Sequence, residues 1–350
     1  MRLTYYHSVD GLRGVTALMI IAGHFFTLKR SMNSVALHSI FEFCGTGVSL
    51  FFLLSGFFIT RILLKSLGSE HYFKNFYVRR ALRIFPLYYF ALAVYYITSR
   101  IFGIGFQYSA SSGSQAYYYF FLQNIANTFS WKASGPYHFW SLALQEHFYL
   151  FWPAIVYFFY KTTGRRLLFV SVLLLLLPLL VRYFMLLKGY SINHFTFARL
   201  DQLALGGILA ILEKNKVLTQ KNLKYFIICI VSGLALTAFA QLKLSSFYFE
   251  LLKHNILGVL YFGVIGYCVI NENNGFLTKA IKQKPLMYLG KISLGMYVWH
   301  VLVVFFINHG SSTGYSLFDF LILVGITTLL ASMSYYWLEK PFLQLKNRFV

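Results

Sequence analysis

Charged residues are scarce in this sequence. Only 12% of the 350 residues are Asp, Glu, Lys or Arg, whereas 58% are hydrophobic. Soluble domains usually carry about 25% charged residues. Apolar runs of about 20 residues, the length of a membrane-spanning helix, recur along the whole chain. The scarcity of charge therefore excludes an ordinary soluble domain and predicts a bundle of helices embedded in lipid.

Acidic residues are much rarer than basic residues. The chain has 10 Asp and Glu against 31 Lys and Arg, a formal net charge of +21. An excess of this size is also typical of proteins that bind nucleic acid. Here, however, the basic residues lie between the apolar runs and do not gather on one domain. We therefore exclude nucleic acid as a partner and expect the lipid bilayer instead.

Cysteine is scarce as well. Cys44, Cys229 and Cys268 are isolated, with no CxxC and no spacing typical of metal ligands, so the sequence predicts no metal site. The first apolar run is followed by no compact cleavage site of the A-x-A kind. We therefore expect residues 12–28 to be a retained span.

The apolar runs predict an all-α, polytopic membrane bundle of about ten transmembrane helices, with residues 1–350 forming one domain. We expect no internal repeat. Residues 102–139 form the one long connection, and their apolar stretch 117–129 is too short to span, which favours an interfacial or re-entrant segment. The predicted spans are 12–28, 45–65, 83–101, 140–160, 167–187, 198–213, 223–242, 254–271, 288–307 and 317–338.

The distribution of Lys and Arg predicts the orientation of the bundle. If the N-terminus is cytoplasmic, the inside segments carry 18 Lys and Arg and the outside segments carry 6. Cytoplasmic loops of membrane proteins are enriched in these residues. We therefore expect both termini in the cytoplasm and segment 102–139 outside. The compact Lys-rich loops favour the inner membrane of a bacterium.

The first span carries three ionisable residues. A charged side chain in lipid is costly and is a functional candidate by default. Asp10 can instead cap the helix, and Arg13 can reach the interface, so both interpretations stay open for these two. His24 lies about 21 Å along the helix from Asp10, where neither explanation applies. It either forms a hydrogen bond to a neighbouring helix or takes part in catalysis.

Depth along the helices groups the polar residues into two layers. Helices rise about 1.5 Å per residue, so His24 and Glu146 lie about 6 Å and 9 Å below the outer ends of their spans. The predicted outer layer holds His24, Glu146, Arg199, Asp201 and His300. The predicted inner layer holds Asp10, Arg13, Arg79, Arg80, Arg83 and Glu339. Arg80 and Arg83 share a helix face. They could bind phosphates through paired hydrogen bonds, or they could only anchor the cytoplasmic end of the helix.

These residues stand in motifs that resemble one family. The motifs, in order, are Arg13-x10-His24 within "DGLRG", "GVSLFFLLSGFFIT" (47–60), "RALR" (80–83), "FWSLALQEHFYLFWP" (139–153), "RLDQLALGG" (199–207), "LGKISLGMYVWH" (289–300) and "LEKPF" (338–342). Along nearly its whole length the chain resembles the acyltransferase-3 family of integral membrane O-acyltransferases. The resemblance covers the membrane part, and we expect no esterase-like domain after it.

The resemblance implies an acyl-CoA donor, commonly acetyl-CoA, as co-substrate, with no permanently bound cofactor. It also implies a hydroxyl acceptor on a cell-surface glycan, a lipid-linked glycan or an exported metabolite. The predicted catalytic residues are His24, Glu146, Asp10 and Arg13, and the predicted donor-binding residues are Arg80, Arg83, Ser55 and Gly56. Residues predicted to support the acceptor are Trp140, Gln145, Tyr149, Arg199, Asp201 and His300.

The sequence leaves several alternatives open. Many family members carry Glu where this chain has Gln145, so either Glu146 has taken the acidic role or Gln145 acts by hydrogen bonding. His24 could be a general base or could carry the acyl group. Ser55 and Gly56 could line the donor's path or could only pack helices. A permease or flippase for an anionic lipid or glycan would also bury charges, but we see no pair of similar halves.

Overall fold

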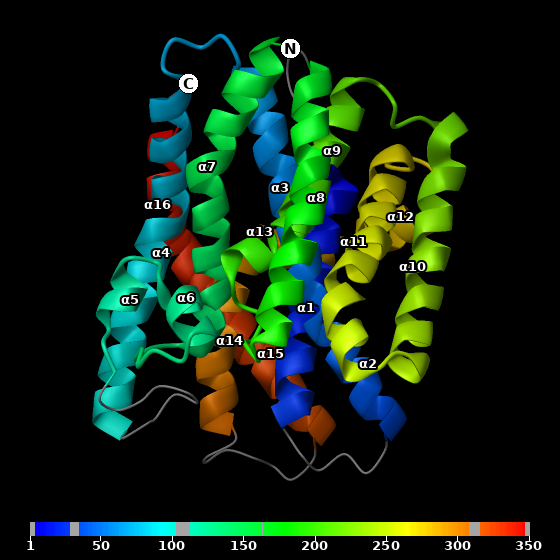
Figure 1. The fold of residues 1–350 in the computed structure, drawn as a ribbon. Helices are drawn as coiled ribbons and strands as arrows, with labels where there is room; N and C mark the ends of the chain where they lie inside the picture. The colour runs from blue at the N-terminus through cyan, green and yellow to red at the C-terminus, as the bar shows by residue number, and fades with distance from the viewer. Residues whose placement is uncertain (1–3, 29–34, 103–112, 163, 308–315, 347–350) are drawn as a thin grey trace. The chain divides into compact units, whose positions relative to one another are not determined.

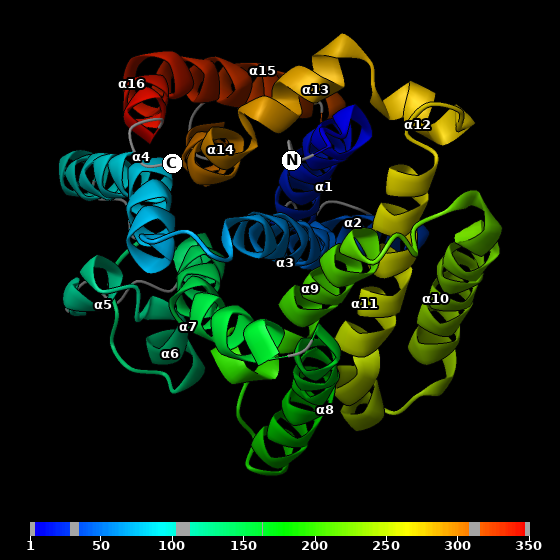
Figure 2. The same ribbon diagram turned by 90° about the horizontal axis from the view of Figure 1, so that it is seen from above.

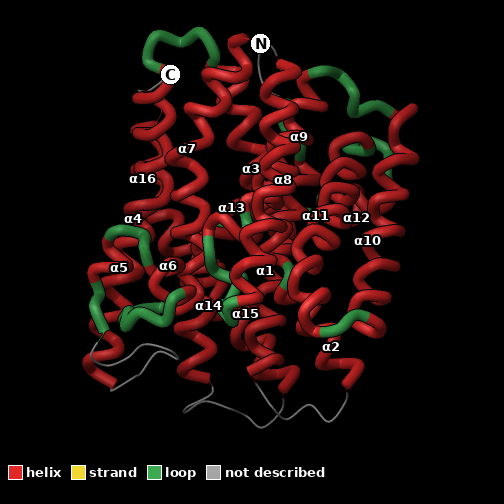
Figure 3. The backbone as a smooth tube through the Cα atoms, in the orientation of Figure 1, coloured by secondary structure: helices red, strands yellow, loops and turns green. Residues whose placement is uncertain are grey.

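The computed structural model describes residues 4–28, 35–102, 113–162, 164–307 and 316–346. Within these ranges the chain is almost entirely helical and contains no strand, only an isolated bridge between Ser114 and Ala133 (Figure 3). The predicted all-α class is therefore confirmed.

The long helices follow the apolar runs of the sequence (Figure 1). They are α1 (His7–Leu28), α2 (Val35–Gly45), α3 (Gly47–Ser66), α4 (Tyr72–Phe102), α7 (Trp140–Thr162), α8 (Gly164–Leu187), α9 (Leu200–Lys214), α10 (Leu223–Lys243), α11 (Ser246–Ile270), α14 (Ser293–Phe306) and α15 (Ser316–Ser334). Shorter helices are α5 (Ala116–Tyr119), α6 (Gln123–Thr128), α12 (Phe276–Ile281), α13 (Lys284–Lys291) and α16 (Lys340–Leu345). Single turns are η1 (Tyr137–Phe139), η2 (Thr196–Ala198), η3 (Gln220–Asn222) and the π-turn η5 (Tyr335–Glu339).

Each predicted span coincides with a helix or a pair of helices. In the described residues, 7 helices are long and apolar enough to cross a membrane, or up to 8 if the bent pair α13–α14 is one span. Helix α7 is outside that set, and Gln145, Glu146 and His147 interrupt its apolar run. Helix α9 has only 15 residues. The polytopic bundle is confirmed, while spanning by α7 and α9 stays a prediction.

The sequence predicted one continuous span over 288–307, and this prediction is wrong. Helices α13 and α14 meet at Ile292 with their axes bent by 79°. The reason is close packing of α13 on the first turns of α1. A Cβ at Gly290 would lie 1.8 Å from the carbonyl oxygen of Asp10, so only glycine lets the two backbones approach this closely.

The chain divides into two compact units. Unit 1 comprises Met1–Tyr6, Ser49–Tyr72 and Gln107–Thr278, and unit 2 comprises His7–Val48, Phe73–Phe106 and Lys279–Val350. In unit 1, α8 packs on α9 and α11, and α10 packs on α11 (Figure 2). In unit 2, α1 packs against α2, α13, α14 and α15.

Apart from Phe102, the last residue of α4, the described part of segment 102–139 begins at residue 113 and packs within unit 1. The side-chain amide of Gln123 donates to the carbonyl of Phe139, and that of Asn124 donates to the hydroxyl of Thr196 at 2.8 Å. Helices α5 and α6 have 4 and 6 residues, so the expectation that 117–129 does not span as one helix is confirmed. The rest of this segment, residues 103–112, lies outside the described residues.

Candidate active site

Two imidazole rings meet in unit 2. The Nδ1 atom of His24 in α1 lies 2.7 Å from the Nε2 atom of His300 in α14. Their ring planes differ by 9° and their centroids are 5.0 Å apart. These values describe two nearly coplanar rings joined edge to edge, along the direction in which imidazole nitrogens carry protons and lone pairs. The sequence predicted a shared layer for His24 and His300, and the structure brings the two rings into contact; their roles stay predictions.

The two rings differ in exposure and support. His300 is 0% exposed, whereas His24 is only half-buried and keeps some accessible surface. The Nδ1 atom of His300 also lies 2.7 Å from the carbonyl oxygen of Tyr297. The pair is therefore held from the α14 side and accessible from the α1 side.

Asp10 and Arg13 lie in the first two turns of α1. Their charged groups are 3.8 Å apart, and Arg13 Nη2 donates to the hydroxyl of Ser293 at 3.0 Å. Because α1 begins at His7, Asp10 is inside the helix and is not its N-cap, so the capping interpretation is wrong. Arg13 instead joins α1 to the first residue of α14.

Basic residues gather near Glu339 in unit 2. Arg79, Arg80 and Arg83 lie on α4, and all three are half-buried. Glu339, at the end of the π-turn η5, is 5% exposed, and the guanidinium groups of Arg83 and Arg13 act on its carboxyl group. A π-turn in a long helix is often found at a functional site.

Lys346 lies just beyond α16 and extends this basic group. Burial, together with the guanidinium groups of Arg83, Arg80 and Arg79, lowers the pKa of Lys346 to about 8. A lysine whose pKa is lowered by its cationic neighbours marks a site of positive potential. We call Arg79, Arg80, Arg83 and Lys346 the basic cluster.

A second set of predicted residues meets in unit 1. The hydroxyl groups of Ser55 in α3 and Tyr149 in α7 form a short hydrogen bond, and Tyr149 Oη lies 3.5 Å from Gln145 Oε1. Gln145 therefore points toward this hydroxyl pair. Glu146, the next residue, is about 100° further round α7. A Cβ at Gly56 would lie 2.0 Å from the Leu203 carbonyl oxygen, which favours the helix-packing interpretation of Gly56.

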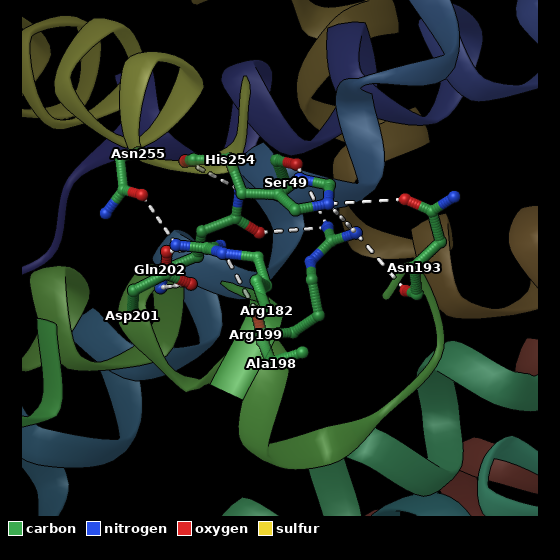
Figure 4. Close-up of polar contacts among 9 residues, drawn as sticks. All are labelled: Ser49, Arg182, Asn193, Ala198, Arg199, Asp201, Gln202, His254 and Asn255. Carbon is green, nitrogen blue, oxygen red and sulfur yellow. Dashed lines mark hydrogen bonds and ion pairs between the residues drawn. The ribbon is translucent and has the colours of Figure 1, made fainter. Parts of the chain in front are cut away.

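Arg199 is the centre of a buried network in unit 1 (Figure 4). Its guanidinium donates to the Ser49 hydroxyl at 3.2 Å and to Gln202 Oε1 at 3.0 Å. It also donates to the Asn193 carbonyl, and its Nη1 lies 3.3 Å from His254 Nε2. The network joins α3, α9, α11 and the loop before η2. These partners occupy both Nη atoms, so Arg199 holds four segments together.

Trp140, at the start of α7, stands beside this network. The Arg199 guanidinium lies 5.7 Å from its ring centroid, and the His194 ring stands at 73° to it with the two centroids 4.8 Å apart. Burial, with the nearby charges of Arg199 and Lys253, lowers the pKa of His194 to about 4. The His194 ring is therefore neutral at physiological pH, and its Nε2 lies 2.8 Å from the Tyr137 hydroxyl.

Asp201 forms a buried ion pair within unit 1. It pairs with Arg182 of α8 at 2.9 Å, and the two side chains are 1% and 0% exposed. Arg182 also donates to the carbonyl of Ala198 and to Asn255. Sequence reasoning overlooked Arg182, although a charged residue inside a predicted span is the same signal that selected His24. Asn193, Gln202 and Ser293 carry no charge and gave no such signal, and His254 stands at the very end of its predicted span.

The predicted outer layer is distributed over both units. His24 and His300 belong to unit 2, whereas Glu146, Arg199 and Asp201 belong to unit 1. A shared layer stays a prediction for these three. In the described residues, no group of three or more His, Cys, Asp or Glu side chains could hold a metal ion.

Comparison with known proteins identifies the family. A family model described as an acyltransferase domain matches residues 6–337, nearly the whole chain. The chain belongs to this acyltransferase family. No solved structure matches it.

Bacterial relatives match along almost the full length of the chain. The peptidoglycan O-acetyltransferase OatA of Listeria monocytogenes is 27% identical over 369 residues, which cover 99% of this chain and 57% of the relative. The O-acetyltransferase OatA of Staphylococcus aureus is 26% identical over 359 residues, which cover 96% of this chain and 57% of the relative. The chain thus spans a little over half the length of these relatives.

Proposed function

We propose that this chain is a membrane O-acetyltransferase that moves an acetyl group from acetyl-CoA to a hydroxyl group of a cell-wall or cell-surface glycan. The observation that carries the proposal is the edge-to-edge contact of His24 and His300, at 2.7 Å, in a member of an acyltransferase family. Imidazole is the side chain best suited to take and give protons near neutral pH.

The basic cluster is the proposed site for the phosphates of acyl-CoA. Guanidinium groups bind phosphate oxygens through two parallel hydrogen bonds, and a nearby ammonium adds charge. Arg80 and Arg83 lie three residues apart on α4, within one turn of the helix. Arg13 and Glu339 lie in the same unit and would order this site. With the termini in the cytoplasm, the donor would enter from that side of the inner membrane.

His24 would then act at the thioester in one of two ways. As a general base it takes the proton of the acceptor hydroxyl while that oxygen attacks the acyl carbon, the C–S bond breaks, and the CoA thiolate takes up a proton. As a nucleophile its nitrogen attacks the acyl carbon and expels CoA as the thiolate. The acceptor oxygen then attacks the acyl-histidine and releases the imidazole, and the proton of the acceptor hydroxyl passes to the thiolate. Both routes need an unprotonated nitrogen on His24.

The residues of unit 1 have supporting roles in this proposal. Ser55 and Tyr149 offer hydroxyl groups, and Gln145 lies beside them in place of the acid usual in the family. Glu146 stays a candidate second acid. Trp140 and the Arg199 network are the proposed acceptor contacts within unit 1, because aromatic rings and fixed polar groups are typical of ligand sites.

The acceptor is proposed from the relatives. The Listeria monocytogenes relative is named a peptidoglycan O-acetyltransferase, which favours a glycan over an exported metabolite or lipid. A bacterial multi-pass protein with this orientation would present the acetyl group at the outer face of the inner membrane.

The test uses purified full-length chain in lipid nanodiscs with radiolabelled acetyl-CoA and a soluble glycan fragment. We expect acetyl transfer to glycan, and we expect His24→Ala and His24→Gln to lose about 10²–10⁴-fold in rate, because neither side chain can take the proton. His38→Ala is the matched control, since His38 is an exposed histidine of unit 2.

The same preparation separates the alternatives. Label that stays on the protein without acceptor and is lost in His24→Ala indicates the acyl-histidine route. An active His24→Gln variant would show that His24 only packs helices. Movement of a glycan or lipid across the bilayer without any acetyl transfer would replace the enzyme with a permease or flippase.

A further inference from the structure

The hydrogen bonds of His300 determine which of its nitrogens carries the proton. Its Nδ1 atom lies 2.7 Å from the carbonyl oxygen of Tyr297. A carbonyl oxygen can only accept a hydrogen bond, so Nδ1 must be the N–H donor. In the neutral ring Nε2 then has no proton and presents a lone pair.

The tautomer of His300 in turn constrains that of His24. His300 Nε2, an acceptor, lies 2.7 Å from His24 Nδ1. For a hydrogen bond to form, His24 Nδ1 must carry the proton, because two facing lone pairs would repel each other. His24 Nε2 is then the unprotonated nitrogen. In the described part of the chain, no hydrogen bond engages that nitrogen.

We propose that His300 is a positioning residue that holds His24 in the tautomer protonated at Nδ1, so that Nε2 is the reactive nitrogen. The reactive part of this inference rests on the proposed function, whereas the tautomer does not. The arrangement resembles the role of the aspartate in a Ser-His-Asp triad, which holds the catalytic histidine in one tautomer. Here a neutral imidazole takes that place.

Tyr95 of α4 fixes the helix that carries His300. Its hydroxyl donates to the carbonyl of Val298 at 2.9 Å and accepts from the backbone N–H of Leu302 at 3.1 Å. Those two backbone groups are four residues apart in α14, the spacing of one helical hydrogen bond. Tyr95 thus bonds to the backbone of α14 on both sides of His300, and it uses one donor and one acceptor, as a hydroxyl can.

When His24 acts as a general base, this chain of bonds determines how the proton moves. The acceptor hydroxyl gives its proton to His24 Nε2, and the resulting imidazolium keeps Nδ1–H directed at His300 Nε2. The lone pair of His300 stabilises that positive charge and can share the proton. When the leaving thiolate takes the proton from Nε2, the original tautomer returns. No proton is gained or lost by the pair over the cycle.

The first experiment reads the tautomer directly. The full-length chain in nanodiscs is labelled with ¹⁵N-histidine, and the His24 signals are assigned by their loss in His24→Ala. We expect Nδ1 of His24 to appear protonated and Nε2 unprotonated. A wild-type His24 protonated at Nε2 would overturn the proposal, whether or not the chain transfers acetyl groups.

The second experiment uses two substitutions that differ in which nitrogen they imitate. In His300→Gln the amide oxygen takes the place of Nε2 and can still accept from His24. In His300→Asn the shorter amide can meet the Tyr297 carbonyl but cannot reach His24. We expect kcat to fall by about 10²–10⁴-fold in His300→Asn, with the KM for acetyl-CoA unchanged, and to recover to within about tenfold of wild type in His300→Gln.

These outcomes separate positioning from packing. If both variants lose kcat equally while His24 keeps its Nδ1 proton in both spectra, the proposal is overturned and His300 only fills space. If both retain wild-type kcat, it is equally overturned. The spectrum of each variant is taken alongside its size-exclusion profile, and a variant that fails to fold is replaced by His300→Glu, whose carboxylate must also accept from His24. An inactive wild type would count against the proposed function alone.

Discussion

Arg182 and Asp201 form an ion pair at 2.9 Å whose side chains are 0% and 1% exposed. Taking two charges out of water costs free energy that their attraction repays only when the geometry is good. The intact pair therefore adds little net stability, but removing one partner alone leaves the other charge buried and uncompensated.

The first prediction concerns this pair. Asp201→Asn leaves Arg182 buried without a countercharge, which is expected to lower the free energy of unfolding by about 3–5 kcal/mol. The double variant Arg182→Met/Asp201→Asn should recover part of the loss, because no uncompensated charge remains. The measurement is thermal unfolding in detergent.

The more exposed pair Lys253–Glu250 gives the matched control. Its side chains are 19% and 33% exposed, and its closest N–O distance is 2.6 Å. Glu250→Gln should cost less than about 1 kcal/mol, since ion pairs that water reaches contribute little. An Asp201→Asn variant as stable as Glu250→Gln would contradict the buried-charge argument.

The second prediction concerns orientation. Lys132 and Lys221 are both exposed, and the Lys and Arg distribution places them on opposite sides of the membrane. In a variant whose three native cysteines are replaced by alanine, Lys132→Cys should react with an impermeant thiol reagent in intact cells. Lys221→Cys should react only after permeabilisation. The reverse pattern would put the basic cluster on the side without acyl-CoA.

The third prediction concerns Arg83. Losing one charge-assisted phosphate contact costs about 1.5–3 kcal/mol, so Arg83→Ala should raise the KM for acetyl-CoA roughly 10- to 150-fold. Arg83→Lys should recover only part, because an ammonium cannot form the forked contact. Arg100→Ala, at the exposed other end of α4, is the control. Wild-type KM in both Arg83→Ala and Arg80→Ala would place the phosphate site elsewhere.

Regular helix geometry explains how far the sequence alone could predict the site. The apolar runs located the helices, and a constant rise per residue placed His24 and His300 at one depth, where they do meet. Periodicity does not say which helix faces which, so it could not predict the contact of Ser55 with Tyr149 or the pairing of Asp201 with Arg182. The bend at Ile292 and the hydrogen bonds of Tyr95 to the backbone of α14 likewise depend on tertiary packing.

The last prediction concerns pH and Lys346. The pKa of this lysine is lowered to about 8 by burial and by the guanidinium groups of the basic cluster. Below that pH the ammonium is charged and can attract phosphate, and above it the charge is lost. The KM for acetyl-CoA should therefore be constant from about pH 6.5 to about pH 7.5 and should rise roughly tenfold toward about pH 9.5.

Two variants isolate the cause of this rise in KM. Lys346→Arg stays charged throughout and should remove the rise, whereas Lys346→Met should show the high KM at every pH. If the wild type and Lys346→Arg follow the same curve, another group is titrating, and Lys346 does not contact the donor.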